Sequence, residues 1–199
     1  IQHAYSLGNT NFITKTYNSG DCNQCHDTPT HHIKGTEWLV SLHANNTRIP
    51  SGSGREACVG CHTTTGFVGR LNGEAVTNTA FNAISCQACH EPHGQTVPAN
   101  NPHLLRMLAS VTMGDGTVIT NAGESALCLQ CHHARNGSDT NSIVGYALGQ
   151  PTWVGGTAFG PHDGPQGDMV EGVNAFTYGQ NIPSSAHRYA VTNACVGCH

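Results

Sequence analysis

The chain has 199 residues and a formal charge of −4, which fits one domain or two small ones. Leu, Ile, Val and Phe together account for only 36 residues, so side chains alone supply little apolar mass for an ordinary core. Only 10% of the residues are Asp, Glu, Lys or Arg, which is too few charges for a disordered chain. Without a Lys/Arg cluster, the sequence also predicts no nucleic-acid partner.

The first predicted element is a short helix over residues 36–44. Trp38, Leu39 and Leu42 lie there at helical spacing, and Thr36 is a candidate N-cap. We therefore expect a helix of two to three turns that ends next to His43.

Two further elements are predicted in the second half of the chain. Residues 111–121 alternate around Gly114-Asp115-Gly116, which predicts a small β-hairpin. Residues 124–133 predict a second short helix. The rest, including the Gly-rich stretch between Cys131 and Cys195, is expected to be coil. The fold class is therefore mostly irregular coil with a few short α-helices and one β-hairpin.

All ten cysteines fall in five copies of Cys-x-x-Cys-His, the attachment motif of c-type haem. The two thiols add across the vinyl groups of the porphyrin, and the His lies beneath the iron as its proximal ligand. The cysteines predicted to attach haem are Cys22, Cys25, Cys58, Cys61, Cys86, Cys89, Cys128, Cys131, Cys195 and Cys198. The predicted proximal ligands are His26, His62, His90, His132 and His199.

Other uses of ten cysteines fit this pattern less well. A disulfide framework does not require a His after every second Cys. A tetrahedral zinc site usually takes two Cys pairs, so five pairs leave one over. Thioredoxin-like motifs occur singly within a βαβ pattern, which is absent from this sequence. The motif count predicts five c-type haems in a single pentahaem domain, residues 1–199, with the porphyrins as the buried apolar mass.

The haem motifs also bear on where the protein is located. Covalent attachment through this motif takes place outside the bacterial or archaeal cytoplasm, so we expect an extracellular or periplasmic protein. No charged start with an apolar run precedes Ile1, which is the pattern of a mature chain after signal cleavage. No stretch approaches the ~18 consecutive apolar residues of a membrane span.

Nine histidines remain after the five proximal ligands, more than five irons need as distal ligands. This surplus predicts bis-His ligation of every haem without use of the three methionines. The predicted distal ligands are those that precede a motif, follow one closely or lie among turn residues: His43, His93, His162 and His187. The fifth is expected to be one of His3, His32 and His31, with His103 and His133 less favoured.

One pair of carboxylates lies outside the haem motifs. Asp163 and Asp168 flank Gly and Pro and offer a weak Ca²⁺ alternative, but their spacing is not that of an EF-hand. A turn-stabilising role is favoured.

Three looser segments accompany the haem motifs. They are Cys-His-Glu-Pro-His-Gly at residues 89–94, Trp-x-x-Ser-x-His-Ala at 38–44 and Pro-His-x-Gly-Pro-Gln-x-Asp-Met at 161–169. With the five motifs, they resemble the multihaem c-type cytochromes of metal-reducing and other anaerobic prokaryotes over essentially the whole chain. Within that class, the chain is similar to the small extracellular cytochromes that polymerise into conductive filaments, the cytochrome nanowires.

This resemblance implies a coil-rich, bis-His-ligated protein of low charge. It also implies that a His near the N-terminus of one subunit ligates a haem of the next, a role that His3 or His31/His32 would carry here. The partners would then be further copies of the chain, joined head to tail, together with redox donor and acceptor proteins or extracellular minerals.

Three functions are compared on the sequence. Electron conduction through a filament is favoured, because stacked haems pass electrons without substrate chemistry and an open head-to-tail contact gives a polymer. A monomeric periplasmic shuttle, or a subunit of an electron-transfer complex, is the alternative, although mixed charges make a strong docking patch unexpected. An enzyme is disfavoured, because catalysis needs an open iron site while His is abundant enough to fill all five. No catalytic residue is predicted.

Overall fold

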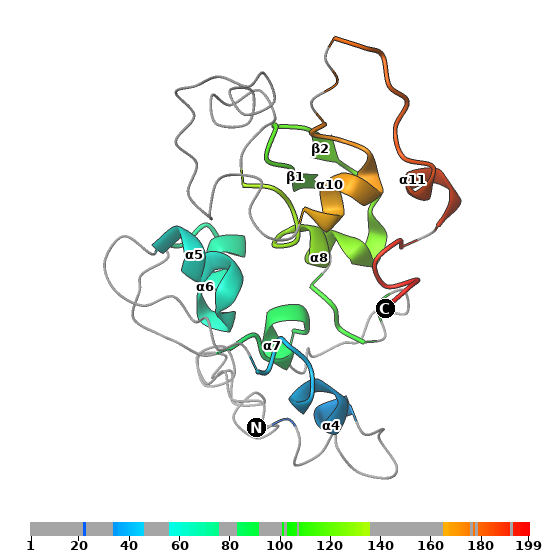
Figure 1. Cartoon of the computed structure of the whole chain (residues 1–199). Coiled ribbons are helices and arrows are strands. Elements are labelled where there is room, and N and C mark those ends of the chain that lie inside the picture. The colour runs from blue at the N-terminus through cyan, green and yellow to red at the C-terminus, as the bar shows by residue number, and fades with distance from the viewer. Residues whose placement is uncertain are drawn as a thin grey trace. The chain divides into compact units, whose positions relative to one another are not determined.

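The computed structural model describes residues 22, 34–45, 56–75, 83–91, 101, 103–106, 108–135, 165–175, 177, 179–191 and 193–199. These residues fall into two compact units divided after Arg106, and each unit is described by itself. The described chain is mostly coil with short helices and one two-stranded antiparallel sheet, as the sequence predicted (Figure 1). No helix among the described residues has the length and hydropathy to cross a membrane.

Helix α4 (Lys34–Leu39) differs from its prediction over residues 36–44. It begins two residues earlier, with a Lys34–Glu37 ion pair of 2.7 Å in its first turn, so Thr36 lies inside the helix and is not the N-cap. It ends at Leu39 because the Asn45 amide donates to the carbonyl oxygens of Leu39 and Ser41, in competition with helical hydrogen bonds.

The apolar face expected for this helix is also only partly buried. Trp38 is half-buried, and its indole N–H donates to the carbonyl oxygen of Ile84 at 2.9 Å. Leu39 and Leu42 are exposed. Trp38 therefore fastens α4 to the segment just ahead of Cys86, while its two apolar neighbours face solvent.

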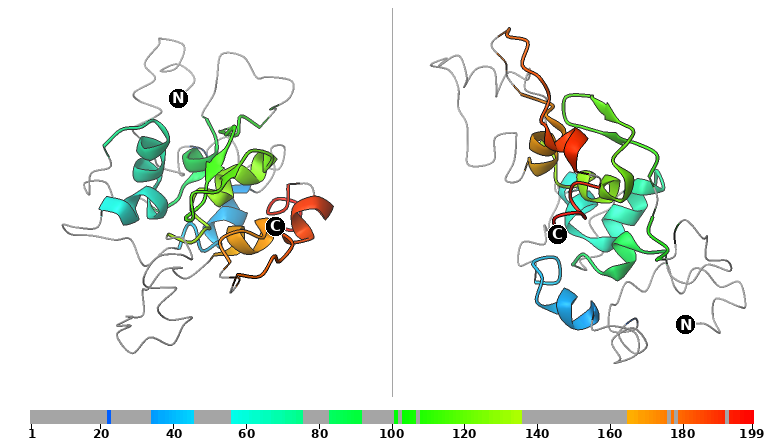
Figure 2. Two further views of the ribbon diagram at one scale, coloured as in Figure 1. Left: turned by 90° about the horizontal axis from the view of Figure 1, so that it is seen from above. Right: turned by 90° about the vertical axis from the view of Figure 1, so that its right-hand side faces the viewer.

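Two helices form the centre of the first unit: α5 (Glu56–His62) and α6 (Thr64–Leu71). They lie side by side in every view (Figures 1 and 2). Thr63 between them is the N-cap of α6, where its hydroxyl accepts from the N–H of Gly66 and donates to the carbonyl oxygen of Val59. A Cβ at Gly66 would lie 2.2 Å from that same carbonyl oxygen, so this close approach requires glycine.

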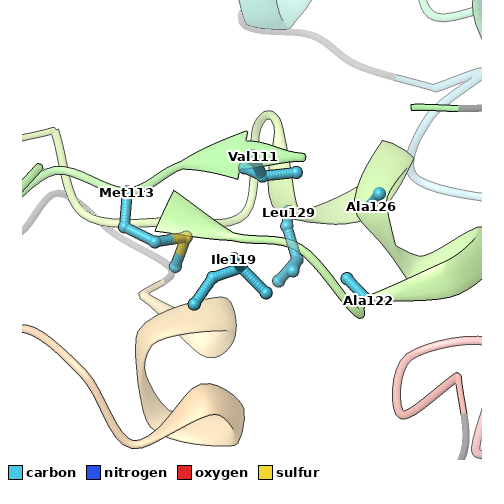
Figure 3. Packing of buried hydrophobic residues seen from close by; sticks show 6 residues of the cluster. All are labelled: Val111, Met113, Ile119, Ala122, Ala126 and Leu129. Carbon is cyan, nitrogen blue, oxygen red and sulfur yellow. The ribbon is translucent and has the colours of Figure 1, made fainter. Parts of the chain in front are cut away.

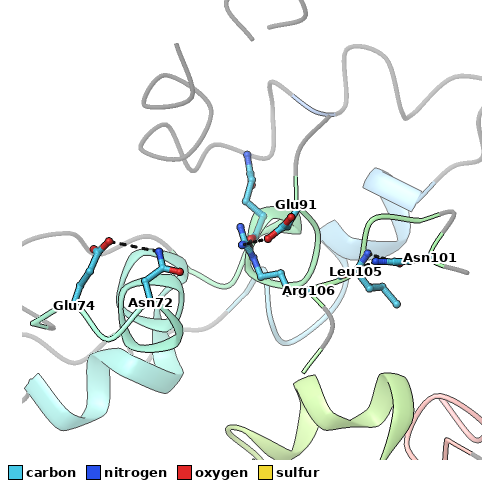
Figure 4. Close-up of polar contacts among 7 residues, drawn as sticks. Asn72, Glu74, Glu91, Asn101, Leu105 and Arg106 are labelled. Carbon is cyan, nitrogen blue, oxygen red and sulfur yellow. Dashed lines mark hydrogen bonds and ion pairs between the residues drawn. The ribbon is translucent and has the colours of Figure 1, made fainter. Parts of the chain in front are cut away.

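A single helical turn, α7 (Cys86–Cys89), follows in the first unit. The chain then returns along it, because Leu105 forms an isolated antiparallel bridge with His90. The side chain of Asn101 braces this return by accepting from the N–H of Leu105 at 2.9 Å and donating to its carbonyl oxygen at 2.7 Å (Figure 4).

The second unit is organised by the predicted hairpin. Strands β1 (Val111–Thr112) and β2 (Val118–Ile119) pair antiparallel, with Val111 opposite Ile119. The turn is closed by Asp115, whose carboxylate accepts from the backbone N–H and the hydroxyl of Thr117, both at 2.9 Å. Gly116, at φ +85°, supplies the left-handed conformation that this turn needs.

The predicted helix over residues 124–133 is shorter than expected and begins one residue earlier. It consists of a 3₁₀ turn, η1 (Gly123–Ser125), followed by α8 (Ala126–Leu129). The apolar side of this helical segment packs against the inner face of the hairpin in a small core (Figure 3). The low Leu/Ile/Val/Phe content did not predict this core. The members of this core are Val111, Met113, Ile119, Ala122, Ala126 and Leu129.

Two further short helices are described in the second unit: α10 (Gln166–Glu171) and α11 (His187–Ala190). A Cβ at Gly167 would lie 2.6 Å from the Leu129 side chain and 2.7 Å from the His132 carbonyl oxygen. Only glycine therefore lets α10 pack this closely on the segment that carries the fourth Cys-x-x-Cys-His motif.

Candidate functional site

Four of the five Cys-x-x-Cys-His motifs are described in full, and of the first only Cys22 is. The second motif closes α5, and each of the other three forms one turn in which the N–H of the His donates to the carbonyl oxygen of the first Cys at 2.9 Å. On such a turn, positions i, i+3 and i+4 share one face. The backbone therefore places both cysteines and the His of each described motif on the same side.

The described cysteines are all thiols, with no disulfide among them. Eight of these nine are half-buried, and Cys198 is exposed. Burial raises the pKa of the Cys89 thiol, although the positive charge of Arg106 acts in the opposite direction.

The third motif has the most completely defined surroundings. Nδ1 of His90 lies 2.7 Å from the carbonyl oxygen of His103. A carbonyl oxygen only accepts, so Nδ1 carries the proton and the lone pair lies on Nε2, the nitrogen that would face a metal. Leu104 adopts a left-handed φ of 51° beside this contact, and its carbonyl oxygen accepts from Glu91 N at 2.7 Å. Sequence reasoning missed this supporting role of residues 103–104, because the contact is with backbone.

Buried hydroxyls connect the second motif to the third. The Thr64 hydroxyl accepts from Ser85 N at 2.7 Å and lies 2.8 Å from the Ala83 carbonyl oxygen. The Ser85 hydroxyl contacts the Thr64 hydroxyl at 2.9 Å and donates to the Gln87 side-chain oxygen at 2.7 Å. Thr64 follows His62 by two residues and Gln87 lies between the cysteines of the third motif, so a buried polar network fixes one motif against the other.

The fourth and fifth motifs are joined in a similar way in the second unit. The Ser125 hydroxyl, three residues ahead of Cys128, accepts from the N–H of Cys195 at 3.0 Å. A hydrogen bond with the Cys128 thiol lowers the pKa of the Cys195 thiol to about 6, although burial acts against this. The first thiols of two consecutive motifs are therefore neighbours.

Helix α10 covers the fourth motif. Gly167 N donates to the carbonyl oxygen of His132 at 2.7 Å. Asp168 is buried, and its two carboxylate oxygens accept from Ala134 N at 2.7 Å and from the Asn174 side chain at 3.0 Å. These bonds support the turn-stabilising role of Asp168, while its proposed Ca²⁺ partner Asp163 lies outside the described residues. Over the described ranges, no three His, Cys, Asp or Glu side chains gather as a metal site.

Two of the predicted distal ligands are described. His43 is exposed in the turn after α4, the helix that Trp38 fastens next to the third motif. His187 is exposed at the start of α11, with Nδ1 3.2 Å from the Ser185 hydroxyl. The other predicted distal ligands fall outside the described residues; they are His3, His31, His32, His93 and His162. Cys25 and His26 of the first motif also fall outside them.

The two less favoured histidines make other contacts, which at His103 come from the backbone. His103 contributes its backbone carbonyl oxygen to His90, and Nδ1 of His133 lies 2.6 Å from the carbonyl oxygen of Ala134.

Helix α11, which carries His187, is joined to α10 by an ion pair of 3.5 Å between Arg188 and the buried Glu171. Burial raises the pKa of the Glu171 carboxyl, and the charge of Arg188 partly offsets this.

Comparison of this chain with protein-family models, curated proteins and solved structures gave no match.

Proposed function

We propose that this protein is a pentahaem c-type cytochrome that transfers electrons. The observation that carries the proposal is the use of all ten cysteines in five Cys-x-x-Cys-His motifs. Each motif would hold one haem through two thioethers and a proximal His, and the haem would supply one-electron redox chemistry.

The local geometry of the described motifs is compatible with that use. Their one-turn backbones place two cysteines and a His on the same side. At the third motif, the contact between His90 Nδ1 and the His103 carbonyl oxygen leaves Nε2 as the nitrogen that would coordinate iron. No disulfide joins the described cysteines, so each keeps a thiol that could add to a vinyl group.

The experiment that tests this proposal is a haem count on the purified protein. A pyridine haemochrome assay and the intact mass under denaturing conditions should both give five covalently bound haems per chain. A different count, or haem that dissociates in acid acetone, would contradict the proposal. Electron paramagnetic resonance should show low-spin ferric haem throughout, because bis-His ligation fills both axial positions.

We further propose that the protein acts as the subunit of an extracellular conductive filament, in which copies join head to tail. Low charge and the surplus of histidines support this, since a His supplied by one copy would complete a haem site of the next. Electron micrographs of native protein test it: filaments are expected. Monodisperse particles alone would favour the alternative, a periplasmic electron shuttle or a subunit of an electron-transfer complex.

A further inference from the structure

Arg106 holds a largely enclosed positive charge against the third motif. Its side chain is 12% exposed, and its Nε donates to the carbonyl oxygen of Gln87 at 3.1 Å. Its backbone N–H donates to the carbonyl oxygen of Cys89 at 2.8 Å. The guanidinium is thereby fixed beside the backbone of Gln87, which lies between Cys86 and Cys89.

Within the described ranges, the carboxylate paired with Arg106 is that of Glu91, which neutralises the charge of Arg106 only in part. Glu91 Oε1 lies 3.4 Å from Nη1 of Arg106, but the Glu91 side chain is 65% exposed. Water screens an exposed charge far more than an enclosed one, so the field of Arg106 dominates on the side of the motif.

We infer that Arg106 raises the reduction potential of the haem carried by the third motif. The inference rests on the proposed function. When a ferric haem takes up one electron and becomes ferrous, its net positive charge falls by one, and no bond is made or broken. A fixed positive charge nearby disfavours the more positive ferric state, so reduction becomes easier. Arg106 would therefore stabilise an electron on the third haem relative to the same haem without this charge.

The test is a potentiometric titration of the holoprotein followed through its visible absorption. In Arg106→Gln, one of the five one-electron components should move to a lower midpoint potential while the other four stay in place. Arg106→Lys keeps the charge, so the midpoint potential of that component should return most of the way to its wild-type value. Lys34→Gln removes an equal charge from a side chain that is 72% exposed in the same unit, and its curve should superimpose on that of the wild type.

A second variant should shift the midpoint potential of the same haem in the opposite direction. Glu91→Gln removes the exposed carboxylate that partly offsets Arg106, so one midpoint should rise by less than Arg106→Gln lowers it. If Arg106→Gln binds fewer than five haems, Glu91→Gln decides: a rise in one midpoint supports the inference, and an unchanged curve overturns it. Five haems with unshifted midpoints in Arg106→Gln, or an equal shift in Lys34→Gln, would also overturn it. None of these results contradicts the cytochrome proposal. That proposal fails only if the purified protein does not carry five covalently bound haems per chain.

Discussion

The Thr64 hydroxyl accepts a hydrogen bond of 2.7 Å from the backbone N–H of Ser85, and both residues are buried. One residue follows the second Cys-x-x-Cys-His motif and the other precedes the third. A contact across 21 residues of sequence therefore sets the distance and orientation between two motifs that the sequence shows only as separate segments.

Replacing Thr64 tests this connection. Thr64→Val keeps the shape but leaves the buried Ser85 N–H without its acceptor, so the free energy of unfolding should fall by about 1–3 kcal/mol. Thr64→Ser keeps the hydroxyl and should lose less, because only one methyl group is removed. Denaturant unfolding of both holoproteins, followed by circular dichroism, measures the difference. Equal losses would mean that packing, rather than the hydrogen bond, matters at this position.

The contact between α5 and α6 predicts opposite effects at two glycines of one helix. Gly66→Ala should destabilise the protein by about 1–3 kcal/mol, because its Cβ would meet the Val59 carbonyl oxygen at 2.2 Å. Gly69→Ala should leave stability unchanged or raise it by up to about 1 kcal/mol, because a Cβ there meets only the flexible Glu74 side chain, at 3.7 Å and beyond. Thermal unfolding of the two variants measures both effects, and a common sign would contradict this account of the packing.

His187 is predicted to be a distal iron ligand. In His187→Ala, one haem should lose its sixth ligand and give a high-spin ferric signal in electron paramagnetic resonance, while the haem count remains five. His103→Ala is the matched control, because His103 contacts His90 through its backbone carbonyl oxygen, which the substitution keeps. That control should stay fully low-spin. A low-spin spectrum for His187→Ala would remove His187 from the ligand set.

Glu171 predicts a pH dependence of stability. Burial raises the pKa of its carboxyl in the folded protein above the ordinary value of 4.5. The folded state then binds the proton more tightly than the unfolded state, so the contribution of Glu171 is full below pH 4.5 and is lost as pH rises through the raised pKa. Unfolding free energies across this range should fall with pH more steeply for the wild type than for Glu171→Gln. Parallel profiles would show that Glu171 is not the titrating group.

Much of the local structure was predictable because it depends on neighbours in sequence. The hairpin over residues 111–121 follows from apolar alternation around a Gly-Asp-Gly turn, and both strands formed where expected. The limits of the helix predicted at residues 36–44 were wrong, because side chains outside the helical pattern decided them. Lys34 and Glu37 extended its start, and the Asn45 amide took the carbonyl oxygen of Leu39 at its end.

The candidate chemistry of this protein follows from the spacing of its motifs alone. Cys, Cys and His at i, i+3 and i+4 reach one side of a single helical turn whatever the rest of the chain does, so the five candidate haem sites can be read without a structure. The surroundings of these sites depend on contacts that form when the chain folds. Three of these contacts come from segments separated from their partners along the chain. They are the His103 carbonyl oxygen at His90, the Ser125 hydroxyl at Cys195 and the guanidinium of Arg106 at the third motif. Such contacts depend on how buried polar groups find partners on folding, which no local pattern specifies.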